Sequence, residues 1–174
     1  ELDTGDLSIV AFYERRCRRI LPALFLVTAI CVPFAWMWLP PDGMLAFSQS
    51  AKAVALLASN FHVWRESGYF DTASELKPLL HTWSLGVEEQ FYLVFPLLML
   101  IPIWSGKARI VLITALGLGS LALATWWVQH QPSAAFYLLP ARAWELLLGS
   151  VLALIQTRKS EPMRPETGLW RELA

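Results

Sequence analysis

Charged residues are scarce in this chain of 174 residues, and their scarcity excludes most soluble folds. Lys, Arg, Asp and Glu make up 16% of the chain, whereas an average soluble domain carries about 25%. Hydrophobic residues reach 56%. Whole segments contain no charge, so apolar and charged residues are not interleaved as they are in a soluble domain. We therefore predict an all-α fold, a polytopic bundle of transmembrane helices.

Several motifs of soluble enzymes are also missing. The chain has no Gly-rich phosphate loop, no His/Cys cluster with metal-ligand spacing, no Gly-x-Ser-x-Gly elbow and no nucleic-acid module. Its two cysteines, Cys17 among arginines and Cys31 in an apolar run, lie in such different settings that we expect free thiols. Net charge is zero. We expect no metal and no nucleic-acid partner, and the sequence predicts no oligomeric state.

The two ends of the chain carry little structural signal. The start has no initiator Met, basic region or cleavage site, so it does not read as a signal peptide. The tail from Thr157 to Ala174 is polar. We expect residues 1–174 to form one incomplete membrane domain, an internal fragment that lacks its first and its C-terminal helices.

Four apolar segments are expected to span the membrane. A span needs about 20 apolar residues, because a helix rises about 1.5 Å per residue. The segments are Ile20–Leu39, Trp83–Trp104, Ile110–Val128 and Phe136–Ile155. Leu45–Trp64 is interrupted by polar residues, and we expect an amphipathic helix that crosses within the bundle, re-enters or lies in the interface.

Basic residues between these segments predict the orientation, because Lys and Arg concentrate on the cytoplasmic side. The basic clusters are Arg15–Arg19, Lys107/Arg109 and Arg158/Lys159. All of them are cytoplasmic if Leu45–Trp64 re-enters, whereas a crossing would break the charge rule. We therefore favour the re-entrant or interfacial arrangement in a cytoplasmic membrane, in contact with lipid.

Polar residues lead into the segment Trp83–Trp104. At helical spacing His81, Ser84, Glu88 and Tyr92 share a stripe. Because an ionised carboxylate is costly in the bilayer, Glu88 and Glu89 should pair, face a wet cavity or be partly protonated, which suits a general acid or base. The alternative is that both carboxylates lie at the interface and face water.

Two further charged groups admit two readings each. Arg142 and Glu145, three residues apart in an apolar span, predict either a buried ion pair or a site for a polar or anionic substrate, with Trp144 beside it as a stacking surface. The four arginines Arg15, Arg16, Arg18 and Arg19 predict an orientation signal and lipid-headgroup contacts, or a grip on the phosphates of a nucleotide-bearing cofactor.

Long motifs in the chain resemble the acyltransferase-3 family of bacterial membrane O-acyltransferases. They are residues 12–24 (FYERRCRRILPAL), 59–61 (SNF), 68–71 (GYFD), 78–92 (PLLHTWSLGVEEQFY) and 136–149 (FYLLPARAWELLLG). Their order and spacing are those of the family, and they cover nearly the whole chain.

The resemblance implies transfer of an acyl group, commonly acetyl, from acyl-CoA to a carbohydrate hydroxyl such as one of lipopolysaccharide O-antigen. It implies acyl-CoA binding by Arg15, Arg16, Arg18 and Arg19, and a principal catalytic histidine upstream of residue 1. His81, Glu88 and Glu89 would then have supporting catalytic roles. The expected acceptor-binding residues are Tyr69, Asp71, Trp83, Ser84, Gln90, Tyr92, Arg142, Trp144 and Glu145.

A transporter or flippase subunit is the competing interpretation. An intramembrane Arg142/Glu145 pair would then line a substrate path. No internal repeat is visible in the sequence, which disfavours this reading.

Overall fold

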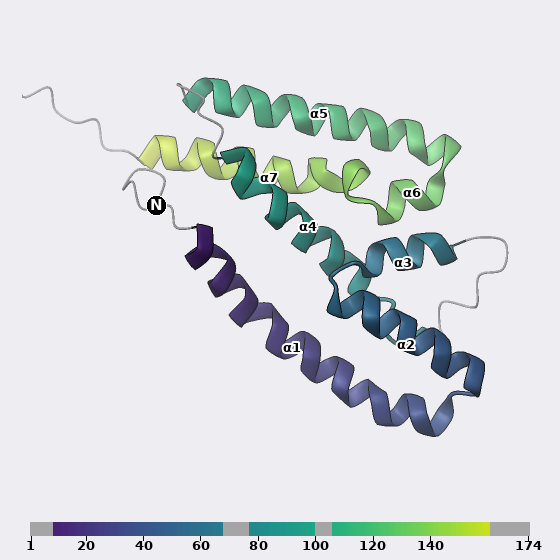
Figure 1. The fold of residues 1–174 in the computed structure, drawn as a ribbon. Coiled ribbons are helices and arrows are strands. Elements are labelled where there is room, and N and C mark those ends of the chain that lie inside the picture. Colours follow the sequence, from purple (N-terminus) through teal and green to yellow (C-terminus); the bar gives the residue numbers. More distant parts are fainter. Residues whose placement is uncertain (1–8, 68–76, 100–105, 161–174) are drawn as a thin grey trace, which may run out of the picture.

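The computed structural model describes residues 9–67, 77–99 and 106–160, and these residues form a helix bundle (Figure 1). The helices are α1 (Ile9–Trp38), α2 (Pro41–Ala55), α3 (Ser59–Glu66), α4 (Thr82–Met99), α5 (Gly106–His130), α6 (Pro132–Tyr137) and α7 (Leu139–Ser160). No strand occurs within the described ranges. The predicted all-α membrane bundle is confirmed.

Three stretches of helix are long and apolar enough to cross a membrane: Ile9–Trp38, Lys107–His130 and Pro132–Gln156. The expected count of four spans is therefore wrong for the described residues, because the segment Trp83–Trp104 does not qualify. Its helix, α4, carries Glu88, Glu89 and Gln90 in its first half, which lower its hydropathy. The remainder of the expected span, residues 100–104, lies outside the described residues.

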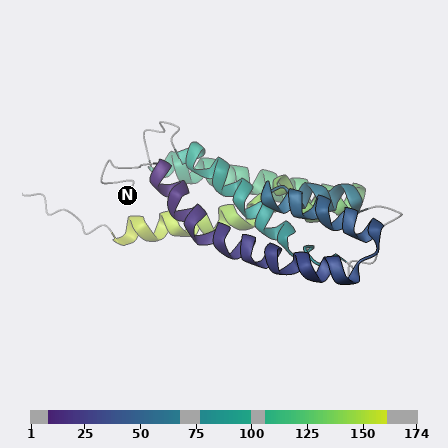
Figure 2. The same cartoon turned by 60° about the horizontal axis from the view of Figure 1, so that its bottom comes forward.

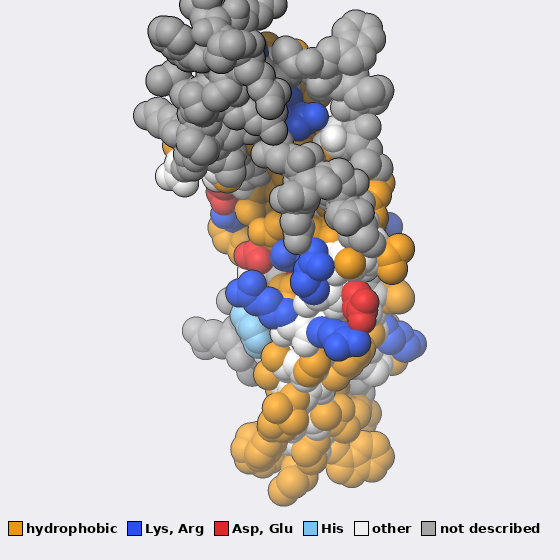
Figure 3. Space-filling model, turned by 90° about the vertical axis from the view of Figure 1, so that its left-hand side faces the viewer, with side chains coloured by type: hydrophobic (Ala, Val, Ile, Leu, Met, Phe, Trp, Pro, Cys, Tyr) orange, Lys and Arg blue, Asp and Glu red, His pale blue; other side chains and the backbone are white. Residues whose placement is uncertain are grey.

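The basic clusters lie toward one end of the bundle. Helices α1 and α5 begin at this end and α7 ends there, and two views agree (Figures 1 and 2). Positions 15–19, 107, 109, 158 and 159 therefore lie toward the same end, as the predicted topology requires. Figure 3 looks onto this end and shows Lys and Arg side chains grouped beside a broad hydrophobic area. We call it the basic end.

The segment expected as one amphipathic helix is broken in two. Helix α2 starts at the end opposite the basic end and runs into the bundle, and α3 returns toward the end where α2 began (Figure 1). The break is at Leu56–Ala58, where Leu57 adopts a left-handed φ of 54°. Such a conformation costs an L-residue about 1–2 kcal/mol, so surrounding contacts must stabilise it. The segment therefore forms a helical hairpin, the shape that a re-entrant segment would take.

Helices α5 and α7 pack along most of their length. Gly117 brings α5 close enough that an added Cβ would lie 3.7 Å from the Leu147 Cβ. The Ser120 hydroxyl donates to the Pro140 carbonyl oxygen at 2.7 Å and accepts from the Trp144 N–H at 3.0 Å. Ser120 therefore links two backbone groups in the first two turns of α7, and this fixes the start of α7 against α5.

Candidate functional site

A small polar pocket lies between the start of α4 and the start of α7. Its volume is about 90 Å³. The lining residues come from two motifs that are far apart in the sequence: Trp83, Ser84, Val87 and Glu88 on α4, and Arg142, Glu145 and Leu146 on α7. The fold thus brings together Trp83, Ser84, Glu88, Arg142 and Glu145, all predicted as site residues. We call this cavity the α4–α7 pocket.

Arg142 is held in place within the α4–α7 pocket. Its Nη2 donates to both carboxylate oxygens of Glu145, at 3.1 and 2.9 Å. The guanidinium also lies over the rings of Trp83 and Phe136, with distances of 5.2 and 5.6 Å to the ring centroids. Cation–π contacts of this kind add to the ion pair and orient the guanidinium plane. Trp83 in turn packs edge-on against Tyr137, at 5.3 Å between centroids.

Glu88 and Glu89, neighbours on α4, have different surroundings. Glu88 is exposed, lines the α4–α7 pocket and forms no ion pair with another described residue. Glu89 instead accepts from Arg16 of α1, whose Nε and Nη2 lie 3.1 and 2.9 Å from its Oε1. The Arg16 guanidinium also stacks 3.1 Å from the centroid of Tyr92. Of these two neighbouring carboxylates, Glu88 is therefore the one available to a molecule in the α4–α7 pocket.

The four arginines of α1 also differ in their surroundings. Arg16 is turned toward α4, with 20% of its side chain exposed. Among the described residues Arg18 pairs only with Glu14 of its own helix, at 2.7 Å, and both side chains are mostly exposed. Arg15 and Arg19 are also exposed. Arg15, Arg18 and Arg19 are thus accessible to an anionic ligand at the basic end, whereas Arg16 joins α1 to α4.

Gln90, predicted to bind the acceptor, lies instead in a buried polar junction. Its amide group exchanges hydrogen bonds with Asn60: Asn60 donates to Gln90 Oε1 at 3.2 Å, and Gln90 donates to Asn60 Oδ1 at 2.7 Å. Asn60 is fully buried and also donates to the Tyr137 carbonyl oxygen at 3.2 Å. Gln90 also donates to the carbonyl oxygen of Leu57, at 3.3 Å. This junction joins α3, α4 and α6. It also supplies a hydrogen bond to the Leu57 carbonyl oxygen at the break between α2 and α3.

The other predicted residues lie outside the pocket. His81 is exposed in the turn before α4, where its carbonyl oxygen accepts from the Ser84 hydroxyl at 3.3 Å. Tyr92 faces Arg16, so the expected stripe of polar residues divides between two sides of α4. Tyr69 and Asp71 lie outside the described residues.

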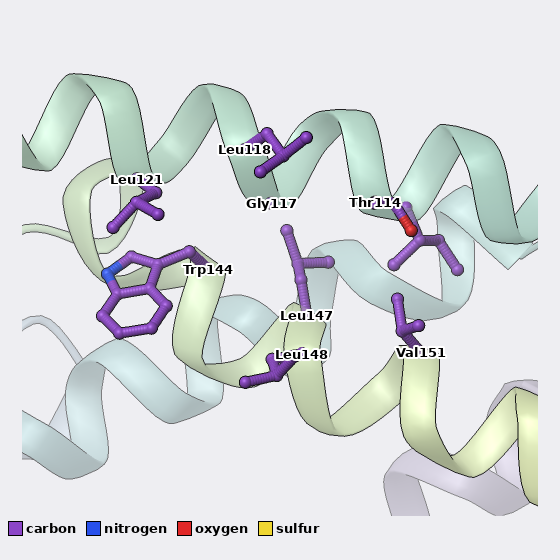
Figure 4. A pocket seen from close by; sticks show the side chains of 9 residues that line it. Thr114, Gly117, Leu118, Leu121, Trp144, Leu147, Leu148 and Val151 are labelled. Carbon is purple, nitrogen blue, oxygen red and sulfur yellow. The ribbon is translucent and has the colours of Figure 1, made fainter.

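Trp144 lines a separate apolar cavity of about 250 Å³ between α5 and α7. Figure 4 shows its indole beside Leu121, with Leu147, Leu148 and Val151 further along α7. Trp144 lies two residues after Arg142, about 200° around the helix, so the two side chains point to nearly opposite sides of α7. The α4–α7 pocket therefore takes its aromatic surface from Trp83.

The structure contains a further polar cluster, around His62, that the sequence did not predict. His62 Nε2 lies 3.2 Å from both Ser50 Oγ and Glu66 Oε1, and Lys77 Nζ lies 3.2 Å from Glu66 Oε2. Both partners of His62 meet one ring nitrogen, unlike a catalytic triad, in which the two nitrogens have separate partners. The cluster joins α2 and α3 to the segment before α4. Only the i,i+4 spacing of His62 and Glu66 signalled it.

Comparison with known proteins gives one family. The acyltransferase-3 model, described as an acyltransferase domain, matches residues 2–169. No solved structure matches the chain.

The curated relatives include two proteins named for acetyl transfer. Peptidoglycan O-acetyltransferase OatA of Listeria monocytogenes is 30% identical over 156 residues, which cover 86% of this chain and 25% of that protein. O-acetyltransferase OatA of Staphylococcus aureus is 29% identical over 157 residues, with coverages of 87% and 26%. An uncharacterized protein of Haemophilus influenzae is 33% identical over 163 residues, with coverages of 88% and 66%. The chain thus spans about a quarter of each OatA protein.

Proposed function

Because this chain belongs to the acyltransferase-3 family, we propose that the full protein transfers an acyl group, acetyl in the simplest case, from acyl-CoA to a hydroxyl of a cell-envelope carbohydrate. The supporting observation is the α4–α7 pocket, which joins the two longest family motifs around a carboxylate, a guanidinium and an indole. Indole rings and carboxylates suit a sugar, because the ring covers its apolar face and the carboxylates accept from its hydroxyls.

The reaction requires a base and a donor site. The acceptor hydroxyl gives its proton to a base, its oxygen attacks the thioester carbonyl carbon, and the C–S bond breaks; the base then passes the proton to the sulfur, so that coenzyme A leaves as its thiol. We assign Glu88 a supporting role at the acceptor hydroxyl, since it is the unpaired carboxylate of the pocket. Arg15, Arg18 and Arg19 are the proposed ligands of the acyl-CoA phosphates.

The acceptor is proposed as an envelope polysaccharide. The resemblance favours O-antigen, and the Listeria relative is named for peptidoglycan. Both polymers expose sugar hydroxyls, so the pocket chemistry suits either one.

Replacing Arg18 by Ala in the full-length protein tests the donor site. We expect acyl transfer to fall while membrane insertion is unchanged, because the ion pair of Arg18 with Glu14 is exposed and lies within α1. Lys52→Ala, an exposed cation on α2, is the matched control and should retain transfer. Wild-type transfer in both Arg15→Ala and Arg18→Ala would remove the arginines from the donor site.

We also propose that the basic end faces the cytoplasm of a bacterial inner membrane. Cys17 is exposed near this end and provides a native label site. In a Cys31→Ser background, a membrane-impermeant maleimide should label Cys17 in inverted vesicles and not in intact spheroplasts. A Cys17→Ser/Cys31→Ser/His130→Cys variant, labelled at the other end of α5, should give the reverse pattern. Labelling of Cys17 from outside would invert the orientation.

A further inference from the structure

The α4–α7 pocket contains more negative than positive charge. Among its described lining residues, Glu88 and Glu145 are acidic and Arg142 is basic. Arg142 is already engaged by both carboxylate oxygens of Glu145 and lies over Trp83. The charge of Glu88 therefore remains uncompensated within the pocket.

The hydrogen-bonding groups of the pocket also favour a ligand without negative charge. An ionised carboxylate only accepts hydrogen bonds, so Glu88 offers acceptor sites alone. Ser84 uses its hydroxyl hydrogen on the His81 carbonyl oxygen, which leaves its Oγ as an acceptor. Arg142 keeps N–H donors beyond those used by Glu145, but its charge is balanced there. The unused groups thus mostly complement ligand donors such as hydroxyl and ammonium groups.

We propose that the α4–α7 pocket selects a neutral or amino sugar and rejects a sugar that carries a carboxylate, with Glu88 as the residue that determines this specificity. The inference rests on the proposed function and defines the acceptor class of its site. A carboxylate bound near Glu88 would meet like charge at the protein surface, where the repulsion is stronger than in bulk water. We expect at least about tenfold discrimination against the acidic sugar, the ratio that corresponds to about 1.4 kcal/mol.

Three methyl glycosides that share one ring provide the test: methyl β-glucoside, methyl β-glucosaminide and methyl β-glucuronide. Each competes against acetyl labelling of envelope polysaccharide by the full-length protein in nanodiscs. The first two should compete at concentrations at least about tenfold lower than the glucuronide. Equal competition by all three, or no competition by any, would overturn the proposal.

Charge variants test the cause of the preference. Because Glu88→Gln is expected to lower turnover, binding of the glycosides is measured by saturation-transfer NMR against empty nanodiscs. Glu88→Gln should narrow the preference for the glucoside and glucosaminide over the glucuronide. Glu88→Gln/Glu145→Gln should reverse that preference, since Arg142 then carries the only charge among the described lining residues. Asp42→Asn removes an exposed carboxylate in the first turn of α2 and should leave the preference unchanged.

The two proposals fail separately. Absence of any acetyl labelling by the wild-type protein would contradict the proposed function, while the NMR measurement would still decide the charge preference. Labelling together with glucuronide binding equal to that of the glucoside would contradict the specificity alone. An unchanged preference in Glu88→Gln would likewise remove Glu88 as its cause.

Discussion

Glu88 and Glu89 are adjacent on α4 and serve different sides of the bundle. Glu88 lines the α4–α7 pocket, while Glu89 accepts hydrogen bonds from both Nε and Nη2 of Arg16 of α1. Consecutive residues of a helix are separated by about 100° around its axis, so two neighbouring side chains can contact two different helices. Helix α4 thus connects the arginine-bearing helix on one side with the proposed acceptor pocket on the other.

Breaking the Arg16–Glu89 pair should destabilise the protein. Glu89 is 12% exposed and Arg16 20%, so removing one partner leaves a poorly solvated charge. We expect Arg16→Gln to lower the free energy of unfolding by about 3 kcal/mol, near the lower limit for a broken buried pair. Intrinsic-fluorescence melting in detergent gives the change.

Arg18→Gln is the matched control for that measurement. Arg18 pairs with Glu14 on the surface, where 79% and 55% of the two side chains are exposed. Because such surface pairs contribute little to stability, the Arg18→Gln variant should melt at the wild-type temperature. The account predicts that Arg16→Gln affects stability and Arg18→Gln affects acyl transfer. Equal melting temperatures for the two variants would show that Arg16 does not hold α1 to α4.

Removing the Asn60 amide should weaken the re-entrant segment. Asn60→Ala leaves the Gln90 amide and the Tyr137 carbonyl without the hydrogen bonds that Asn60 supplies. An unsatisfied buried polar group costs about 1–3 kcal/mol, so we expect a loss in that range. Gln49→Ala, an exposed amide on α2, should melt like the wild type. A wild-type melting temperature for Asn60→Ala would contradict the assigned junction.

Gly86 allows the re-entrant break to approach α4 closely. A Cβ at this position would lie 3.1 Å from Asn60 Oδ1, 3.2 Å from Ser59 Oγ and 3.3 Å from the Leu57 carbonyl oxygen. Gly86→Ala should therefore destabilise the protein by about 1–3 kcal/mol, the usual cost of overpacking.

Gly149→Ala is the comparison for Gly86→Ala, because a Cβ at Gly149 meets no atom within 4 Å. Alanine favours the helix by up to about 1 kcal/mol over glycine, so this variant should be neutral or slightly more stable. If both variants have the same melting temperature, helix propensity and not the close approach determines the result for Gly86.

The sequence predicted the pocket better than the contacts that support it. Trp83, Ser84 and Glu88 were identified through helical spacing and the family motif, and the structure places them opposite Arg142. Local periodicity could not reveal the pairing of Asn60 with Gln90, because it depends on the helix break at Leu57 and on residues 30 positions apart. The distribution of basic residues favoured a re-entrant or interfacial segment at Leu45–Trp64, and the hairpin of α2 and α3 is compatible with that prediction.

The sequence could not distinguish the roles of residues of the same type. Four arginines within five positions are equally suited to bind phosphate, and only the packing of α1 shows that Arg16 contacts Glu89 and Tyr92. Trp144 is adjacent to the predicted pocket in sequence, but the helix turns it toward α5 (Figure 4). The expected span at Trp83–Trp104 was wrong because Glu88, Glu89 and Gln90 lower the hydropathy of α4, and of these three residues only Glu88 lines the α4–α7 pocket.

The most direct test of the account is to supply acetyl-labelled acetyl-CoA to the cytoplasmic face of membrane vesicles that contain the full-length protein and an envelope polysaccharide. The account predicts label in ester linkage on the polysaccharide, lost on mild alkaline treatment and strongly reduced in the Arg18→Ala variant. Accumulation of polysaccharide in the vesicles without label would contradict acyl transfer and favour a transporter.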